Sequence, residues 1–242
     1  MPPLREFIEL EVDGGERVPA VLQRPRSATP APAVLLLHGF SSRKERMADS
    51  IGRALLEHGV ASLAIDLPLH GDREGEIEGL SRRNPLVLVQ TWRLAIREAA
   101  GALHYLARHA AIDPDRIGLA GYSLGAYLGV IVAAESGLVR AVALAAGGDL
   151  PEETPFASLV RTIADPDRAV RKLAGRPLLM INGRYDRTIR PEQARRLFDS
   201  AREPKELRWY EGGHWPPSHA IDQAAEWLAA RLRTPRVYAR PA

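Results

Sequence analysis

A serine between two glycines is the part of the chain best suited to chemistry. The segment reads Gly121-Tyr122-Ser123-Leu124-Gly125, between an apolar run at 116–120 and a helix-forming run at 126–134. A strand, then Gly-x-Ser-x-Gly, then a helix predicts a tight turn that holds the hydroxyl clear of the backbone. The glycines fit because side chains there would collide with the adjoining strand and helix. The positive end of the helix dipole stabilises a negatively charged oxygen. The sequence therefore predicts that Ser123 is a nucleophile.

A serine hydroxyl needs a base to take its proton and an acid to orient that base. His214, in Gly212-Gly213-His214-Trp215, is the candidate base, and Asp186, in Gly183-Arg184-Tyr185-Asp186, is the candidate acid. Each follows a predicted strand, and sites in open parallel sheets lie outside the carboxyl ends of strands. Asp149 is the second candidate acid. Two plainer roles stay open: a turn or capping aspartate at 186, and a surface histidine at 214.

A tetrahedral oxyanion would need two backbone N–H donors. We expect one from Leu124, directly after the nucleophile, and one from Phe40, in the loop after His38-Gly39. His38 itself is expected to brace that loop. Three further residues are candidates for the substrate pocket: His70, Tyr122 and Trp215. A loop histidine without a role is an equal alternative for His70, and Tyr122 is expected to pack beneath the serine turn.

Strands alternate with helices along the chain, which predicts an α/β fold with a mostly parallel central sheet and helices on both faces. The expected strands lie at 7–12, 17–23, 33–37, 60–65, 117–121, 139–145, 178–181 and 206–210. The expected helices lie at 46–58, 86–109, 126–134, 191–202 and 220–232. The first two strands form a hairpin through a turn at 13–15, and a second turn is expected at 113–115. Residues 1–242 are expected to form one domain, with a small cap at 147–175 and a loose tail after 234.

Composition excludes several kinds of site. The chain has no cysteine, which rules out disulfides, thiolate metal sites and a cysteine nucleophile. Its histidines and carboxylates show no metal-ligand spacing, and no glycine-rich phosphate loop is present, so no metal and no cofactor are expected. A net charge of +3 with scattered basic residues argues against a nucleic-acid partner.

The lengths of the apolar segments indicate where in the cell the protein is expected. No apolar run is long enough to cross a bilayer, and the N-terminus has no apolar signal region. We therefore expect a cytoplasmic protein without a membrane partner, and its oligomeric state stays open. Two asparagines and three methionines fit either a heat-adapted source or a GC-rich genome.

The chain resembles the α/β-hydrolase superfamily, and within it the single-domain serine esterases of the dienelactone-hydrolase-like and prolyl-oligopeptidase-like branch. The segments that carry the resemblance are residues 35–40, 65–66, 70–71, 115–125, 183–186 and 213–214. The family's chain order of serine, acid and histidine falls on Ser123, Asp186 and His214. Two features depart from the branch: true dienelactone hydrolases use a cysteine nucleophile, and no residues are available for an oligopeptidase propeller.

The resemblance implies a serine hydrolase that cleaves a small carboxylic ester through an acyl-enzyme on Ser123, without a cofactor. Three alternatives use the same scaffold. A peptidase or amidase would cleave amides with the same triad, and an acyltransferase would pass the acyl group to an alcohol or amine. A binding protein would keep the pocket without turnover.

Overall fold

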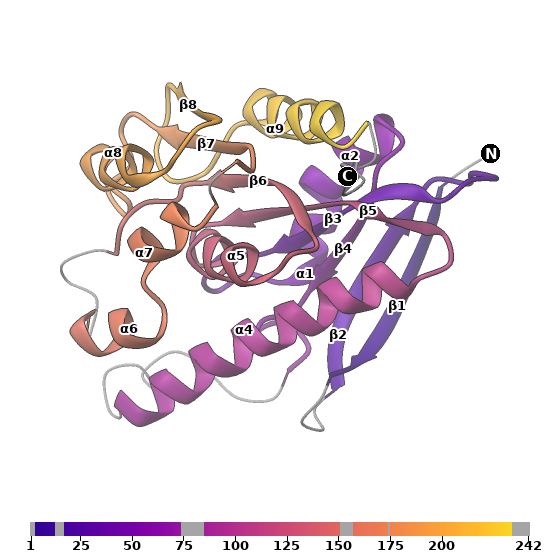
Figure 1. Cartoon of the computed structure of the whole chain (residues 1–242), viewed down its shortest axis with the longest axis horizontal. Coiled ribbons are helices and arrows are strands. Elements are labelled where there is room, and N and C mark those ends of the chain that lie inside the picture. Colours follow the sequence, from indigo (N-terminus) through magenta and orange to yellow (C-terminus); the bar gives the residue numbers. More distant parts are fainter. Residues whose placement is uncertain (1–2, 13–16, 74–84, 151–156, 174, 234–242) are drawn as a thin grey trace, which may run out of the picture.

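The computed structural model describes residues 3–12, 17–73, 85–150, 157–173 and 175–233 (Figure 1). Its centre is an eight-stranded sheet in the order β1-β2-β4-β3-β5-β6-β7-β8. The strands are β1 (Leu4–Glu11), β2 (Arg17–Arg24), β3 (Ala31–Leu37), β4 (Ala61–Ile65), β5 (Ile112–Tyr122), β6 (Val139–Ala145), β7 (Leu178–Gly183) and β8 (Lys205–Tyr210). The strands β4, β3, β5, β6, β7 and β8 run parallel, and β1 and β2 extend the sheet as antiparallel strands. The predicted α/β class is confirmed.

Helices cover both faces of the sheet. Their bounds are α1 (Lys44–Met47), η1 (Ala48–Gly52), α2 (Arg53–Glu57), α4 (Pro85–Arg108), α5 (Leu124–Glu135), α6 (Ala157–Ile163), α7 (Pro166–Arg171), α8 (Pro191–Ser200) and α9 (Ser218–Arg231). On one face, α4, α5, α7 and α8 pack on side chains such as Leu35, Leu119 and Met180. On the other, α1, η1, α2 and α9 pack on the alternating partners, such as Leu36 and Ile181. The central parallel strands β3, β4 and β7 are therefore buried on both sides, as their continuous apolar sequences predict, whereas the edge strand β8 is only partly buried.

Two local predictions need correction. The turn expected at 113–115 lies within β5, where the pairing with β3 jumps from Ala31↔Ile112 to Ala33↔Ile117. Asp113 still closes a local loop, because its carboxylate accepts the N–H of Asp115 at 2.9 Å. Strand β5 therefore contains the 113–115 turn as a bulge. The helix expected at 46–58 begins two residues earlier and contains the π-helical segment η1.

The segment predicted as a cap contains two short helices, α6 and α7. Asp165 begins α7 and accepts the N–H groups of Asp167 and Arg168, the pattern of a helix cap. In the fold, α7 packs beside α5 and α8 (Figure 1). Residues 151–156 lie outside the described residues, as do the turn at 13–15 and the tail after 234, so the cap and the single-domain boundary stay predictions. Within the described residues, no helix is long and apolar enough to cross a membrane.

Candidate active site

The turn between β5 and α5 carries Ser123 in a strained backbone conformation, with φ +52° and ψ −113°. Two glycines allow this turn. A Cβ on Gly121 would lie 2.1 Å from the carbonyl oxygen of Gly125, and a Cβ on Gly125 would lie 2.1 Å from that of Leu37. No L side chain fits either position without moving backbone, so the sequence motif is a packing requirement. The strained turn places the Ser123 hydroxyl at the N-terminus of α5.

Three side chains predicted from separate segments meet at this turn. His214 Nε2 lies 2.9 Å from Ser123 Oγ, and His214 Nδ1 lies 2.8 Å from Asp186 Oδ2. The Ser123 hydroxyl can therefore donate to one imidazole nitrogen while the other donates to the carboxylate. Ser123 is 8% exposed, and the Asp186 side chain is fully buried. The geometry is that of a nucleophile, a base and an orienting acid.

Asp186 is held rigidly from its other oxygen. Its Oδ1 accepts the backbone N–H groups of Thr188 at 2.8 Å and Ile189 at 3.0 Å. This leaves Oδ2 aimed at His214. Asp149, the second candidate acid, lies elsewhere: its Oδ1 accepts from Arg161 at 2.9 Å and from the Leu150 N–H at 2.9 Å. The structure therefore brings Asp186, and not Asp149, to the histidine.

The loop that carries His214 is anchored by a tyrosine below it. The Tyr210 hydroxyl, at the end of β8, donates to the carbonyls of Gly213 at 3.0 Å and His214 at 3.3 Å. The loop also crosses the end of β7 so closely that a Cβ on Gly183 would lie 2.1 Å from the Gly213 oxygen. Glycine at 183 is therefore what lets this loop bring the imidazole to the serine.

The predicted oxyanion donors lie on two loops that meet at the serine. A Cβ on Gly39 would be 3.2 Å from the Ser123 Cβ, so the loop leading to Phe40 passes directly beside the nucleophile. Leu124 is the first residue of α5, where a backbone N–H has no helical acceptor. In the described part of the chain, neither the Phe40 nor the Leu124 N–H donates a backbone hydrogen bond. Phe40 and Leu124 therefore stay the candidate oxyanion donors.

His38 braces the Phe40 loop, as expected from the sequence. Its Nδ1 donates to the Gly39 carbonyl at 2.7 Å, and its Nε2 accepts the Leu67 N–H at 3.0 Å. This pattern requires a neutral ring. Burial in the protein interior lowers the pKa of His38 to about 4. This effect is larger than the opposite effect of the hydrogen bond to Gly39, which raises the pKa. The histidine therefore ties the loop after β3 to the loop after β4 without carrying a charge.

A buried ionic cluster that sequence reasoning missed ties the same two loops together. Lys44 Nζ lies 2.8 Å from Asp66 Oδ2 and 2.5 Å from Asp72 Oδ2, and Asp66 also accepts the Lys44 N–H at 2.8 Å. The Lys44 side chain is 2% exposed and that of Asp66 is fully buried. Burial alone would lower the pKa of Lys44, but the hydrogen bonds that its ammonium donates to Asp66, Asp72 and Glu45 raise it to about 12. In the sequence Lys44 sits among four consecutive charged residues, a pattern typical of a solvated surface.

The three predicted pocket residues lie on two sides of the triad. The Tyr122 ring stacks on Trp215 at 5.0 Å between centroids and lies 5.3 Å from His214. His70 lies beside Phe40 instead, with ring centroids 5.7 Å apart. Its Nδ1 donates to the Pro68 carbonyl at 2.8 Å, and its buried Nε2 finds no hydrogen-bond partner among the residues that the structure describes. Burial lowers the pKa of His70, so the ring is held neutral with Nε2 as an unused acceptor.

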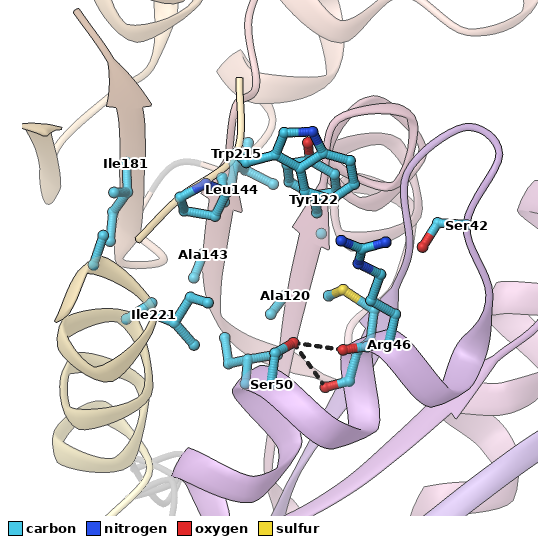
Figure 2. Close-up of a pocket in the computed structure, with 17 residues that line it drawn as sticks. Ser42, Arg46, Ser50, Ala120, Tyr122, Ala143, Leu144, Ile181, Trp215 and Ile221 are labelled. Carbon is cyan, nitrogen blue, oxygen red and sulfur yellow. Dashed lines mark hydrogen bonds between the residues drawn. The ribbon is translucent and has the colours of Figure 1, made fainter. Parts of the chain in front are cut away.

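Two cavities adjoin this region. A cavity of about 30 Å³ lies between the loop at 67–70, α4 and the first turns of α5, and both His70 and Leu124 line it. A larger one, of about 320 Å³, lies on the face covered by α1, η1 and α9, and Tyr122 and Trp215 line it (Figure 2). Within the described residues, no group of three or more histidine and carboxylate side chains is placed to hold a metal ion.

Comparison with known proteins defines the class to which this fold and site belong. The model of the alpha/beta hydrolase family matches residues 34–227, and the chain belongs to this family. The match contains Ser123, Asp186 and His214.

Individual relatives are distant. The chain is 30% identical to a putative hydrolase, YtaP, of Bacillus subtilis over 134 residues, which are 50% of this chain and 45% of that protein. The chain thus spans about half the length of this relative. It is 26% identical to a putative esterase, YitV, of the same organism, over 83% of this chain and 89% of that protein. A cold-adapted esterase from an Arctic intertidal metagenomic library superimposes with a TM-score of 0.74 at 24% identity, covering 94% of both chains. These matches establish the fold and leave the substrate open.

Proposed function

We propose that the chain is a hydrolase of small carboxylic esters that forms an acyl-enzyme on Ser123. The observation that carries this proposal is the unbroken hydrogen-bond chain from Asp186 through His214 to Ser123, with distances of 2.8 and 2.9 Å. A serine hydroxyl alone is a poor nucleophile, and this arrangement supplies both the base and its orienting acid. The names of the putative esterase and of the cold-adapted esterase support the same choice of substrate.

The positions of these side chains support the following reaction. Ser123 Oγ attacks the ester carbonyl while its proton passes to His214 Nε2. The carbonyl oxygen becomes an oxyanion that accepts hydrogen bonds from the N–H groups of Leu124 and Phe40. His214 then gives its proton to the departing alcohol, and Asp186 stabilises the imidazolium meanwhile. His214 then takes a proton from a water molecule, which attacks the acyl-enzyme carbonyl. The bond to Ser123 Oγ breaks, His214 gives that proton to Ser123, and the acid is released.

The test is a burst assay with p-nitrophenyl esters of increasing acyl length, run on the wild type and on Ser123→Ala. We expect a rapid release of p-nitrophenol that requires Ser123, and an intact-mass increase equal to the acyl group. The matched control is Ser218→Ala, at an exposed serine on α9, which should keep wild-type turnover. Turnover that survives in Ser123→Ala with the fold intact would refute the proposal.

The same samples separate the alternative reactions. Matched ester and anilide substrates distinguish an esterase from a peptidase, because amide cleavage with the same triad would release the anilide amine. An added alcohol or amine distinguishes transfer from hydrolysis, because a transferase would yield the acylated acceptor instead of the free acid. If no ester of any acyl length is turned over, the scaffold is a binding protein, a peptidase or a more specialised acyltransferase, and ester hydrolysis is rejected.

A further inference from the structure

The larger cavity is lined almost entirely by apolar side chains and lies against the sheet, away from the serine. Its floor is formed by β5, β6 and β7, and its sides by the α1–η1 helices and α9 (Figure 2). At about 320 Å³ it holds the volume of roughly ten waters. This is at the lower end of the size of cavities that bind small organic molecules.

Small side chains create this space. Ala120, Ala143 and Ala145 point from the strands, and Ala220 and Ala224 face them from α9. On either side of them the same face carries larger residues, including Leu36 and Ile181. Well-packed interiors leave few voids larger than a water molecule. Five alanines around one void therefore mark a site with room for an apolar group.

One cationic group stands at the mouth of the cavity. The guanidinium carbon of Arg46 lies 4.3 Å from the ring centroid of Trp215, which is itself 55% exposed (Figure 2). In the described part of the chain, no carboxylate forms an ion pair with Arg46. Two serines, Ser42 and Ser50, also line the cavity, and the Ser50 hydroxyl donates to the Arg46 carbonyl at 2.6 Å. Arg46 is thus an exposed donor with no anion, next to an apolar hollow.

We propose that this cavity binds an unbranched aliphatic carboxylate, with the chain among the alanines and the carboxylate on Arg46. The lining favours an alkyl chain over a polar ligand, and an arginine pairs with a carboxylate through two parallel N–H donors. A chain of about eight carbons fills the volume of roughly ten waters. An amine of the same length would place its ammonium against Arg46 and be repelled. Binding does not require ester hydrolysis, so this site and the proposed function stand or fall separately.

The site adjoins the triad through two aromatic rings. Tyr122 and Trp215 line the cavity, and each also lies against His214, at 5.3 and 6.4 Å between ring centroids. A chain bound in the cavity would therefore contact two rings that also contact His214.

Titration calorimetry with octanoate tests the proposal, using both the wild type and Ser123→Ala. We expect saturable binding with one site per chain in both proteins. Arg46→Gln should weaken it about tenfold, the equivalent of about 1.4 kcal/mol. Ala143→Leu and Ala224→Leu should each abolish it by filling the cavity from the strand and the helix side. Octan-1-ol should bind more weakly than octanoate, and octylamine should not bind.

Matched controls keep the result interpretable. Arg53→Gln removes an exposed arginine outside the cavity, and Ala230→Leu enlarges an exposed alanine on the same helix as Ala224. Both should bind octanoate as the wild type does, and thermal melts should show that every variant is folded. Three outcomes would overturn the proposal: no octanoate binding, binding that survives both filling substitutions in folded protein, or binding of octylamine as tight as that of octanoate.

Discussion

Tyr122 contacts His214 twice, through its ring and through its hydroxyl. The two ring centroids are 5.3 Å apart, and the hydroxyl donates to the His214 carbonyl at 3.4 Å. The residue before the proposed nucleophile thus supports His214, the proposed base. Tyr210 donates to the same carbonyl at 3.3 Å, so the backbone of His214 has two anchors. Positioning by the ring and anchoring by the hydroxyl can therefore be separated by substitution.

We expect Tyr122→Ala to lower kcat at least tenfold and Tyr122→Phe to lower it by less than about threefold. Alanine removes the ring beside the imidazole, and misplacement of a catalytic group by about 1 Å costs up to 10² in rate. Phenylalanine keeps the ring, and Tyr210 keeps the carbonyl anchored. The measurement is kcat and KM on one p-nitrophenyl ester. Equal losses in the two variants would show that the hydroxyl, not the ring, positions His214.

Asp186→Asn should lower kcat by about 10³–10⁴ with little loss of stability. An amide in this position no longer offers a negative charge to His214 Nδ1, and the related substitution in other serine triads drops kcat by about 10⁴. The amide oxygen can still accept the N–H groups of Thr188 and Ile189, so the loop stays in place. Steady-state kinetics and a thermal melt check both parts. A loss smaller than tenfold would remove Asp186 from the triad.

Lys44→Met should lower the free energy of unfolding by about 3–5 kcal/mol, because it leaves a buried charge without its partner. That charge is on Asp66, whose side chain is fully buried. The control is Arg17→Gln, which breaks the exposed surface pair with Glu9 and should cost about 1 kcal/mol or less. Urea titrations measure both values. Similar values for the two variants would mean that the buried cluster contributes no more than a surface pair.

The stability of the protein should fall as the pH is lowered from 6.5 to about 4, in part because of His38. In the unfolded chain His38 takes up a proton near pH 6.5, whereas in the folded protein burial lowers its pKa to about 4. The unfolded state therefore binds more protons across this window, and lower pH favours it. The shift is worth roughly 3 kcal/mol.

The variant His38→Gln isolates this contribution. Glutamine does not titrate, so the plot of unfolding free energy against pH should be flatter across the same window, even where the variant is less stable overall. His70, whose pKa is also lowered by burial, supplies part of the slope that remains. Urea midpoints at several pH values give the comparison. An unchanged slope in His38→Gln would show that His38 is not the group that titrates.

Much of the architecture can be read from the sequence because its signals are local. The apolar runs that become β3, β6 and β7 are each bounded by turn residues, and the glycines around Ser123 mark a turn that has no room for larger side chains at those positions. Asp186 and His214 could be chosen because both follow strand ends, which parallel topology gathers at one edge of the sheet. Gly39 lies close to Ser123, which supports the prediction that the neighbouring Phe40 N–H is an oxyanion donor.

What the sequence could not show depends on distant segments. Lys44 has the sequence environment of a surface lysine, and only the approach of the loop after β4 brings Asp66 and Asp72 around it. Asp113 and Asp115 match a turn signal, but pairing on both sides keeps them within β5. The 320 Å³ cavity is invisible for another reason. It is lined by alanines from three separate elements, and the alanines within any one element do not by themselves indicate a cavity.

The glycine-bounded turn at Ser123 has a practical consequence. The turn tolerates only an unbranched side chain at its centre, and cysteine differs from serine there by a single atom. The chain contains no cysteine of its own. Ser123→Cys would therefore give the protein one thiol, placed within reach of His214, to which a spectroscopic label or a cross-linker attaches at a single known position. Because the chain has no other cysteine, a thiol-reactive reagent would modify this variant at position 123 alone.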